Sequence, residues 1–307
     1  MDYLKIFSPA TVANVSCGFD SLGFAVDEVG DEMAFTKTPN LGVKIINITG
    51  ADLTYDVDKN AASAVVKKML IDAKANFGIE LTIHKGFSPG SGLGSSAASA
   101  AGAAFGTNHL LGNIYSEQEL TKFAMFGEEV ACGSLIADNV AAAIYGGFVL
   151  IRSYEPLEII KLPVPNELRL VAIHPQIEVR TEDARNVLPK EILLKDAVTQ
   201  WANVGGLISG LHSNDYKLIS NSLVDIIVEP HRKKLIPYFD DVKNAAIDAG
   251  ALGAGISGSG PTIFALCKGD EIAKEVYNAI ERSYKNKGID FTMFISKVNP
   301  QGMKIIN

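Results

Sequence analysis

The chain has 307 residues, 47% hydrophobic and 21% charged, a globular composition that excludes disordered, collagen-like and coiled-coil classes. At roughly 150 residues per domain, this length predicts one large domain or two modest ones. The formal net charge is −7 and no basic surface is indicated, so we expect no nucleic-acid partner.

The remaining composition indicates the compartment. The three cysteines, Cys17, Cys132 and Cys267, are scattered without CxxC spacing, which favours reduced thiols in the cytosol. The N-terminus has no signal-peptide pattern. The longest uncharged run, residues 86–116, is interrupted by Gly, Ser, Pro and Asn, unlike a membrane span. We expect a soluble, cytoplasmic protein with no membrane partner.

In the first half of the chain, short or alternating apolar runs predict strands, and apolar residues at helical spacing predict helices. The expected strands are residues 4–7, 33–36, 43–48, 79–83 and 148–151. Helices are expected at residues 60–77 and 95–111. A capping box at residues 116–119 predicts the start of another helix.

In the second half, Pro156, Pro163 and Pro165 indicate a domain boundary near residues 150–165. Beyond it we expect strands at residues 168–173, 262–266 and 291–298. Helices are expected at residues 190–223, 237–249 and 271–286, with a glycine-rich loop at residues 250–260. Strands and helices do not alternate regularly, which favours an α+β fold over a doubly wound sheet.

The strongest chemical signal is the segment Ser-Pro-Gly-Ser-Gly-Leu-Gly-Ser-Ser-Ala-Ala-Ser at residues 88–99. Its glycines allow close backbone approach to a ligand, and the N-terminus of the following helix is an anion site. Ser95 and Ser96 add hydroxyls for phosphate or metal. No Lys follows Gly94, so this is no Walker A loop, and its GxGxG spacing differs from a dinucleotide fingerprint. The segment predicts a phosphate cradle, with a purely structural turn as the alternative.

A second glycine-rich loop contains GxGxxG at Gly253, Gly255 and Gly258. It follows a predicted helix and enters a predicted strand, whereas a dinucleotide fold requires strand, loop and helix in that order. We interpret residues 255–262 as a tight loop whose backbone supports the active site from the second domain.

Residues 9–23, Pro-Ala-Thr-Val-Ala-Asn-Val-Ser-Cys-Gly-Phe-Asp-Ser-Leu-Gly, complete a set of three ordered motifs with these two loops. Together they resemble the signatures of the GHMP kinases, a superfamily that includes galactokinase and mevalonate kinase. The Asn-x-x-x-Gly-Phe-Asp core of the first motif is similar to that of the homoserine kinase family.

The resemblance implies a two-domain α+β kinase. Its N-terminal ATP-binding domain, residues 1–155, would resemble ribosomal protein S5 domain 2. Its C-terminal domain, residues 156–307, would be ferredoxin-like. The implied reaction is ATP- and Mg²⁺-dependent phosphorylation of the side-chain hydroxyl of L-homoserine to O-phospho-L-homoserine, in threonine biosynthesis. The implied assembly is a homodimer.

The resemblance also implies roles for individual residues. ATP would bind at Pro89, Gly90, Ser91, Gly92, Leu93, Gly94, Ser95, Ser96, Ala97, Ala98 and Ser99. Mg²⁺ would be held by Ser96 and Glu128. The substrate would contact Asn14, Asp20, Asn139, Arg185, Arg232 and Gly258, with catalytic contributions from Asn14, Asn139 and Lys85. Asp20 would pair with the ammonium group, and the two arginines would hold the carboxylate.

The charge distribution agrees with this division of labour. Residues 1–150 contain no Arg, so phosphate there must be met by backbone N–H groups, Mg²⁺ and Lys85. All six arginines lie in the second part, from which a carboxylate can be bound in bidentate fashion. Taken without the motifs, Arg185 and Arg232 would be interpreted as surface ion-pair residues and Glu128 as a solvated helix residue.

Two positions depart from the family pattern. Ile136 and Ala142 replace the usual His and Pro around Asp138-Asn139-Val140-Ala141, which affects the expected acceptor preference. Mevalonate-kinase relatives supply a catalytic Asp in the acceptor site. The matching residue here is Asn139, which cannot accept a proton as a base, so we predict catalysis without a dedicated protein base. The alternatives are a GHMP kinase for another alcohol such as mevalonate, a non-catalytic ATP-binding regulator, or an NAD-dependent enzyme.

Overall fold

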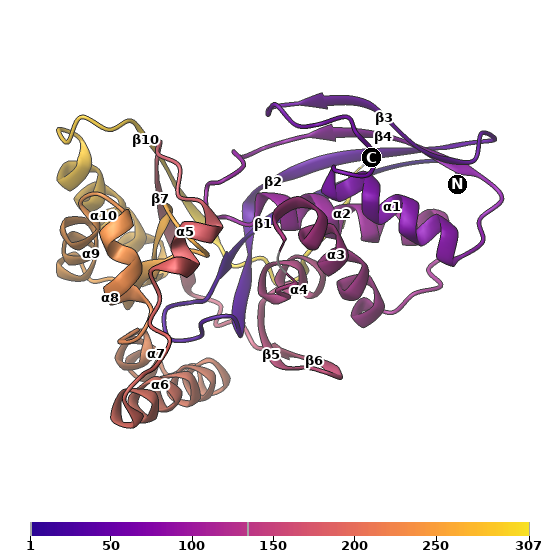
Figure 1. Cartoon of the computed structure of the whole chain (residues 1–307). Coiled ribbons are helices and arrows are strands. Elements are labelled where there is room, and N and C mark those ends of the chain that lie inside the picture. Colours follow the sequence, from indigo (N-terminus) through magenta and orange to yellow (C-terminus); the bar gives the residue numbers. More distant parts are fainter. Residues whose placement is uncertain (1, 134, 307) are drawn as a thin grey trace.

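A computed structural model describes residues 2–133 and 135–306 and contains two α+β lobes side by side (Figure 1). The first lobe is built on a seven-stranded sheet with the order β11-β1-β2-β4-β3, extended from β2 by β5 and β6. Its strands are β1 (Tyr3–Ala13), β2 (Leu22–Thr38), β3 (Gly42–Thr49), β4 (Gly78–His84), β5 (Phe148–Tyr154), β6 (Leu157–Leu162) and β11 (Lys304–Ile305). Neighbouring strands are antiparallel except β3 and β4, which are parallel.

Four helices pack beside this sheet (Figure 1): α1 (Ala61–Asp72), α2 (Ser95–Leu110), α3 (Glu117–Cys132) and α4 (Asp138–Tyr145). The predicted capping box at Ser116 and Glu119 is present and opens α3. Helix α2 lies close to the sheet because its contact face carries small residues. A Cβ on Gly106 would lie 2.4 Å from the ring of Phe35. This packing fixes the position of the glycine-rich loop before α2 relative to the sheet.

The second lobe contains a four-stranded antiparallel sheet with the order β10-β7-β9-β8. Its strands are β7 (Leu168–Pro175), β8 (Gly253–Ile256), β9 (Ile263–Lys268) and β10 (Phe291–Lys297). Its helices are α5 (Thr181–Asn186), α6 (Leu194–Ser213), α7 (Tyr216–Ser222), α8 (Glu229–Arg232), α9 (Phe239–Asp248) and α10 (Gly269–Tyr284), with the short 3₁₀ helix η1 (Lys233–Leu235). This strand order and connectivity are the ferredoxin-like arrangement expected from the sequence, and the α+β prediction is confirmed.

The two lobes share a buried apolar core. Three clusters of buried side chains form the interior of the described chain. The middle cluster joins Val12 and Phe24 of the first sheet to Leu170 and Phe264 of the second, with Leu207 of α6. The rings of Phe24 and Phe264 meet edge to face with centroids 6.3 Å apart. Burial of this apolar surface fixes the two lobes against each other.

The sequence did not predict β6, α4 or α5, and β2 is much longer than the expected strand at residues 33–36. Two further elements also differ from the sequence expectations. The predicted loop at residues 250–260 contains the strand β8, which pairs with β9. Glycine is needed at residue 253 because a Cβ there would lie 2.4 Å from the Leu223 Cβ. Helix α1 ends at Asp72, several residues earlier than expected, and Lys74 then adopts a positive φ of 48°. The predicted boundary between residues 155 and 156 falls in the turn between β5 and β6 and stays a prediction. Across the described residues, the helices are too short or too polar to cross a membrane.

Candidate active site

A cavity of about 520 Å³ is lined by residues from both lobes. Most of the residues singled out in the sequence line it: Asn14, Asp20, Pro89, Gly90, Gly92, Gly94, Ser95, Ser96, Glu128, Asn139, Arg185, Arg232 and Gly258. The others are buried beside its lining: Lys85, Ser91, Leu93, Ala97, Ala98 and Ser99. Residues distant in the sequence therefore converge on one space.

The turn between β1 and β2 carries Asn14 and Asp20. Both residues have positive φ, 69° and 54°, a conformation that Asn and Asp tolerate better than most side chains. The Asn14 side chain accepts from the Asp20 backbone N–H at 3.0 Å and donates to the Gly258 carbonyl at 2.8 Å. Asn14 therefore fixes the Asp20 turn and ties it to the second glycine-rich loop.

The N-terminus of α2 faces the cavity. Its N-cap, Gly94, is left-handed with a φ of 70° and provides no side-chain cap. The first intrahelical bond runs from the Ala98 N–H to the Gly94 carbonyl, so the preceding N–H groups of the helix are free of helical partners. A Cβ on Gly94 would lie 2.2 Å from Thr11 Oγ1. Glycine is required here, and the exposed N–H groups with the helix dipole form an anion site.

Lys85 lies behind this helix start and forms a buried ion pair with Asp31. Its Nζ also donates to the Ser95 carbonyl at 2.8 Å and to Ser99 Oγ at 2.9 Å. Burial lowers the pKa of Lys85, and the Asp31 charge opposes that shift. With only 3% of Lys85 exposed, its ammonium anchors the first turn of α2. Its expected contribution to catalysis stays a prediction.

Ser96 and Glu128 form the candidate metal site. Burial raises the pKa of Glu128 to about 7, while a hydrogen bond with the Ser96 side chain opposes the rise. Its Oε1 is buried and has no hydrogen-bond partner in the structure. A hydroxyl beside an unsatisfied carboxylate oxygen fits a hard cation such as Mg²⁺. In the described ranges, no three His, Cys, Asp or Glu side chains cluster as a complete metal site, so phosphate oxygens of a nucleotide would have to complete the coordination.

Asn139 lies at the start of α4 with both ends of its amide engaged. Its Oδ1 accepts from Thr11 Oγ1 at 2.7 Å, and its Nδ2 donates to Asp138 Oδ1 at 3.3 Å. Asp138 Oδ1 also accepts from the Asn139 backbone N–H at 2.7 Å. Burial, reinforced by the charge of Asp20, raises the pKa of Asp138 to about 7. Thr11 and Asp138 together set the orientation of the Asn139 amide.

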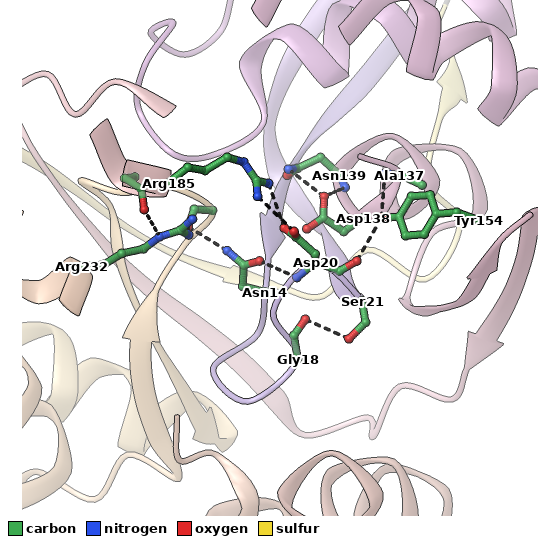
Figure 2. A network of polar contacts seen from close by, with 12 residues as sticks. Asn14, Gly18, Asp20, Ser21, Ala137, Asp138, Asn139, Tyr154, Arg185 and Arg232 are labelled. Carbon is green, nitrogen blue, oxygen red and sulfur yellow. Dashed lines mark hydrogen bonds and ion pairs between the residues drawn. The ribbon is translucent and has the colours of Figure 1, made fainter. Parts of the chain in front are cut away.

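The predicted carboxylate and ammonium binders contact each other (Figure 2). Arg185 donates two bonds to Asp20, Nη1 to Oδ2 at 3.1 Å and Nη2 to Oδ1 at 3.0 Å. Arg232 is buried, and donates from Nε to the Ala184 carbonyl and from Nη1 to the Gly258 carbonyl, both at 2.9 Å. Desolvation, and then the charge of Arg185, lower the pKa of Arg232 to about 10. Opposite charges are thus concentrated at one end of the cavity.

Two participants were missed by the sequence reasoning. Asp138 lines the cavity, although the sequence assigned a role only to its neighbour Asn139. The signal was an acidic residue at the head of an alanine-rich, buried helix. Thr11 reaches Asn139 across 128 residues of sequence, and no local pattern could have indicated that contact.

Comparison with known proteins defines the class. Residues 59–147 match the GHMP kinases N terminal domain, and residues 207–286 match the GHMP kinases C terminal model. Mevalonate kinase from L. major, 16% identical over 96% of both chains with a TM-score of 0.72, shares the fold alone. Fold and family models together define a GHMP kinase.

The more similar relatives narrow the class. A curated homoserine kinase of Chlorobium phaeobacteroides strain BS1 is 48% identical over 98% of both chains. One of Methanococcus vannielii is 40% identical over 91% of this chain and 94% of that protein. The crystal structure of homoserine kinase from Cytophaga hutchinsonii is 52% identical, with a TM-score of 0.96 over 100% of this chain and 98% of that one. The chain belongs to the homoserine kinase family of GHMP kinases.

Proposed function

We propose that this chain transfers the γ-phosphoryl group of ATP to the side-chain hydroxyl of L-homoserine, producing O-phospho-L-homoserine for threonine biosynthesis. The observation that carries the proposal is that one cavity is lined by both kinds of binding group. A helix N-terminus suited to phosphate faces the same space as a carboxylate and two arginines suited to an amino acid. Family membership supports the choice of homoserine.

The ion pair between Arg185 and Asp20 indicates how an amino acid binds. A zwitterion carries the same two charges, so its carboxylate can take the place of Asp20 on Arg185 while its ammonium group pairs with Asp20. Arg232 uses Nε and Nη1 for backbone carbonyls, which leaves Nη2 for the substrate carboxylate. An uncharged alcohol would replace neither half of the ion pair.

The phosphates of ATP bind at the loop of residues 89–99. Free N–H groups at the start of α2 and the positive end of its dipole attract the phosphate oxygens. The loop is held from the second lobe, because Ser257 Oγ donates to the Gly92 carbonyl and Thr262 Oγ1 to the Ser91 carbonyl, both at 2.6 Å. The second glycine-rich loop thus acts as a support for the first.

Ser96 and Glu128 would hold Mg²⁺, which supplies positive charge to the transferred phosphoryl group when bound. Phosphoryl transfer requires mainly positioning and charge stabilisation from the protein. Asn139 lines the cavity with its amide orientation fixed, and we assign it to orienting the acceptor hydroxyl. An amide accepts no proton at neutral pH, so the reaction proceeds without a dedicated base at that position.

We also propose a cytoplasmic homodimer. Helix α6 exposes apolar side chains at helical spacing, with Leu194 73% and Trp201 57% exposed on either side of Val198. Exposed apolar patches of this kind characterise protein interfaces. Cys17 and Cys267 are buried thiols, in keeping with a reducing compartment. Sedimentation should give a dimer that Trp201→Glu dissociates, and a monomeric wild-type protein would contradict the assembly.

The substrate is tested by measuring ADP release from Mg·ATP with L-homoserine, mevalonate, L-serine and L-threonine side by side. Selective turnover of L-homoserine is expected. Turnover of another alcohol alone would mean that the nucleotide-binding part of the site was interpreted correctly and the acceptor-binding part was not. Nucleotide binding without turnover of any acceptor would favour the regulator alternative.

A further inference from the structure

Phe19 contacts both arginines of the acceptor site. The Cζ atom of Arg232 lies 4.9 Å from the centre of the Phe19 ring, and the Cζ atom of Arg185 lies 5.6 Å from it. Phe19 is half-buried in the turn that carries Asp20, and it belongs to none of the three apolar clusters of the described chain. Its contacts with the guanidinium groups, rather than core packing, therefore distinguish this side chain.

Two guanidinium groups at one ring repel each other unless something offsets their charges. Asp20 neutralises Arg185. Arg232 hydrogen-bonds only the neutral carbonyls of Ala184 and Gly258 in the described structure, and the charges of Asp20, Asp225 and Asp138 act on it without a direct ion pair. The face of an aromatic ring carries partial negative charge and attracts a guanidinium group, most strongly where water is excluded. An aliphatic side chain of similar volume would fill the same space without that attraction.

We propose that Phe19 is a positioning residue that holds the guanidinium groups of Arg185 and Arg232 side by side for the carboxylate of the amino-acid substrate. This inference rests on the proposed function and adds a determinant of acceptor specificity to it. Phe19 acts through the arginines, so its contribution depends on the acceptor carrying a carboxylate. A ring that merely filled space would serve acceptors with and without that group equally.

The test compares two acceptor-site ligands in the wild type, Phe19→Leu and Phe19→Tyr. The first is L-homoserine, measured by its KM. The second is 3-aminopropan-1-ol, which is homoserine without its carboxylate, measured by its competition against L-homoserine. We expect Phe19→Leu to raise the KM of L-homoserine about tenfold. The KM of ATP, kcat and the affinity for 3-aminopropan-1-ol should each change by less than about threefold, because none of them requires the arginine pair to hold a carboxylate. Phe19→Tyr retains an aromatic ring and should keep the KM of L-homoserine near its wild-type value.

The matched control is Phe77→Leu. Lys37 Nζ lies 4.3 Å from the centre of the Phe77 ring, and neither residue belongs to the cavity lining. It should leave all four quantities unchanged. Equal weakening of both ligands in Phe19→Leu, or an unchanged KM for L-homoserine, would overturn the role of Phe19. A wild-type protein inactive toward L-homoserine would instead overturn the proposed function, and the role of Phe19 with it.

Discussion

Replacing Asp138 with Asn should stabilise the folded protein at neutral and alkaline pH. Burial, then the charge of Asp20, raises the pKa of the Asp138 carboxyl from 3.8 to about 7. Between these two values the folded state retains a proton that the unfolded chain releases. The contribution of Asp138 to the free energy of unfolding is therefore fully present below about pH 4. It falls as pH rises toward 7, because the folded state binds more protons than the unfolded chain in that window.

The magnitude follows from the shift. Roughly 3 pKa units at 1.36 kcal/mol each amount to about 4 kcal/mol above pH 7. Asn is neutral at every pH, and its Oδ1 can still accept the bond that the Asn139 backbone N–H now gives to Asp138. The advantage of Asp138→Asn over the wild type should therefore grow by about 2–3 kcal/mol between pH 5 and pH 8.

Urea unfolding followed by far-ultraviolet circular dichroism at pH 5 and pH 8, without nucleotide, measures this difference. A matched control is Asp248→Asn, an exposed aspartate on α9, which should show no comparable pH dependence. The same stability difference at both pH values would refute the reasoning. So would an Asp138→Asn protein that is less stable than the wild type at pH 8.

Three further changes test other parts of the site. Lys85→Met should cost about 3–5 kcal/mol of unfolding free energy, because Asp31 becomes an unpaired buried charge. In urea unfolding, the double variant Lys85→Met/Asp31→Asn should recover part of the lost unfolding free energy, and no recovery would contradict the ion pair. Arg185→Ala should raise the KM of L-homoserine about tenfold or more and spare that of ATP; an unchanged homoserine KM would remove its assignment. Gly94→Ala should raise the KM of ATP at least about tenfold, since the left-handed backbone and Thr11 Oγ1 at 2.2 Å leave no room for a Cβ; normal ATP kinetics would contradict the close approach.

Local patterns predicted much of the fold. The capping box at Ser116 and Glu119 predicted the start of α3 because both side chains bond to the nearby backbone. The alanine-rich run predicted α2 and its tight packing because Ala favours helices and is small. Strand β8 was not predicted, because Gly253 and Gly255 are typical of loops. Only contact with Leu223, brought close by the tertiary fold, explains why glycine is needed in that strand.

In the site, too, the sequence predicted the residue types but not the contacts that depend on the tertiary fold. The resemblance singled out Asp20 and Arg185 separately, each with a substrate group as its partner. Their mutual ion pair spans 165 residues, and no sequence spacing could reveal it. Likewise, Lys85 was expected near phosphates, but its burial against Asp31 depends on how β2, α2 and the end of β4 meet. Residue types indicated the chemistry, whereas the partners depend on the packing of distant elements.

Identifying the phosphorylated product of L-homoserine tests the central claim most directly. Phosphorus NMR of the reaction mixture with Mg·ATP should show a phosphomonoester coupled to the side-chain methylene protons, formed in equal amount with ADP. An acyl phosphate on the carboxylate would contradict the placement of the arginines on that group. Inorganic phosphate as the only product besides ADP would contradict transfer to the acceptor hydroxyl altogether.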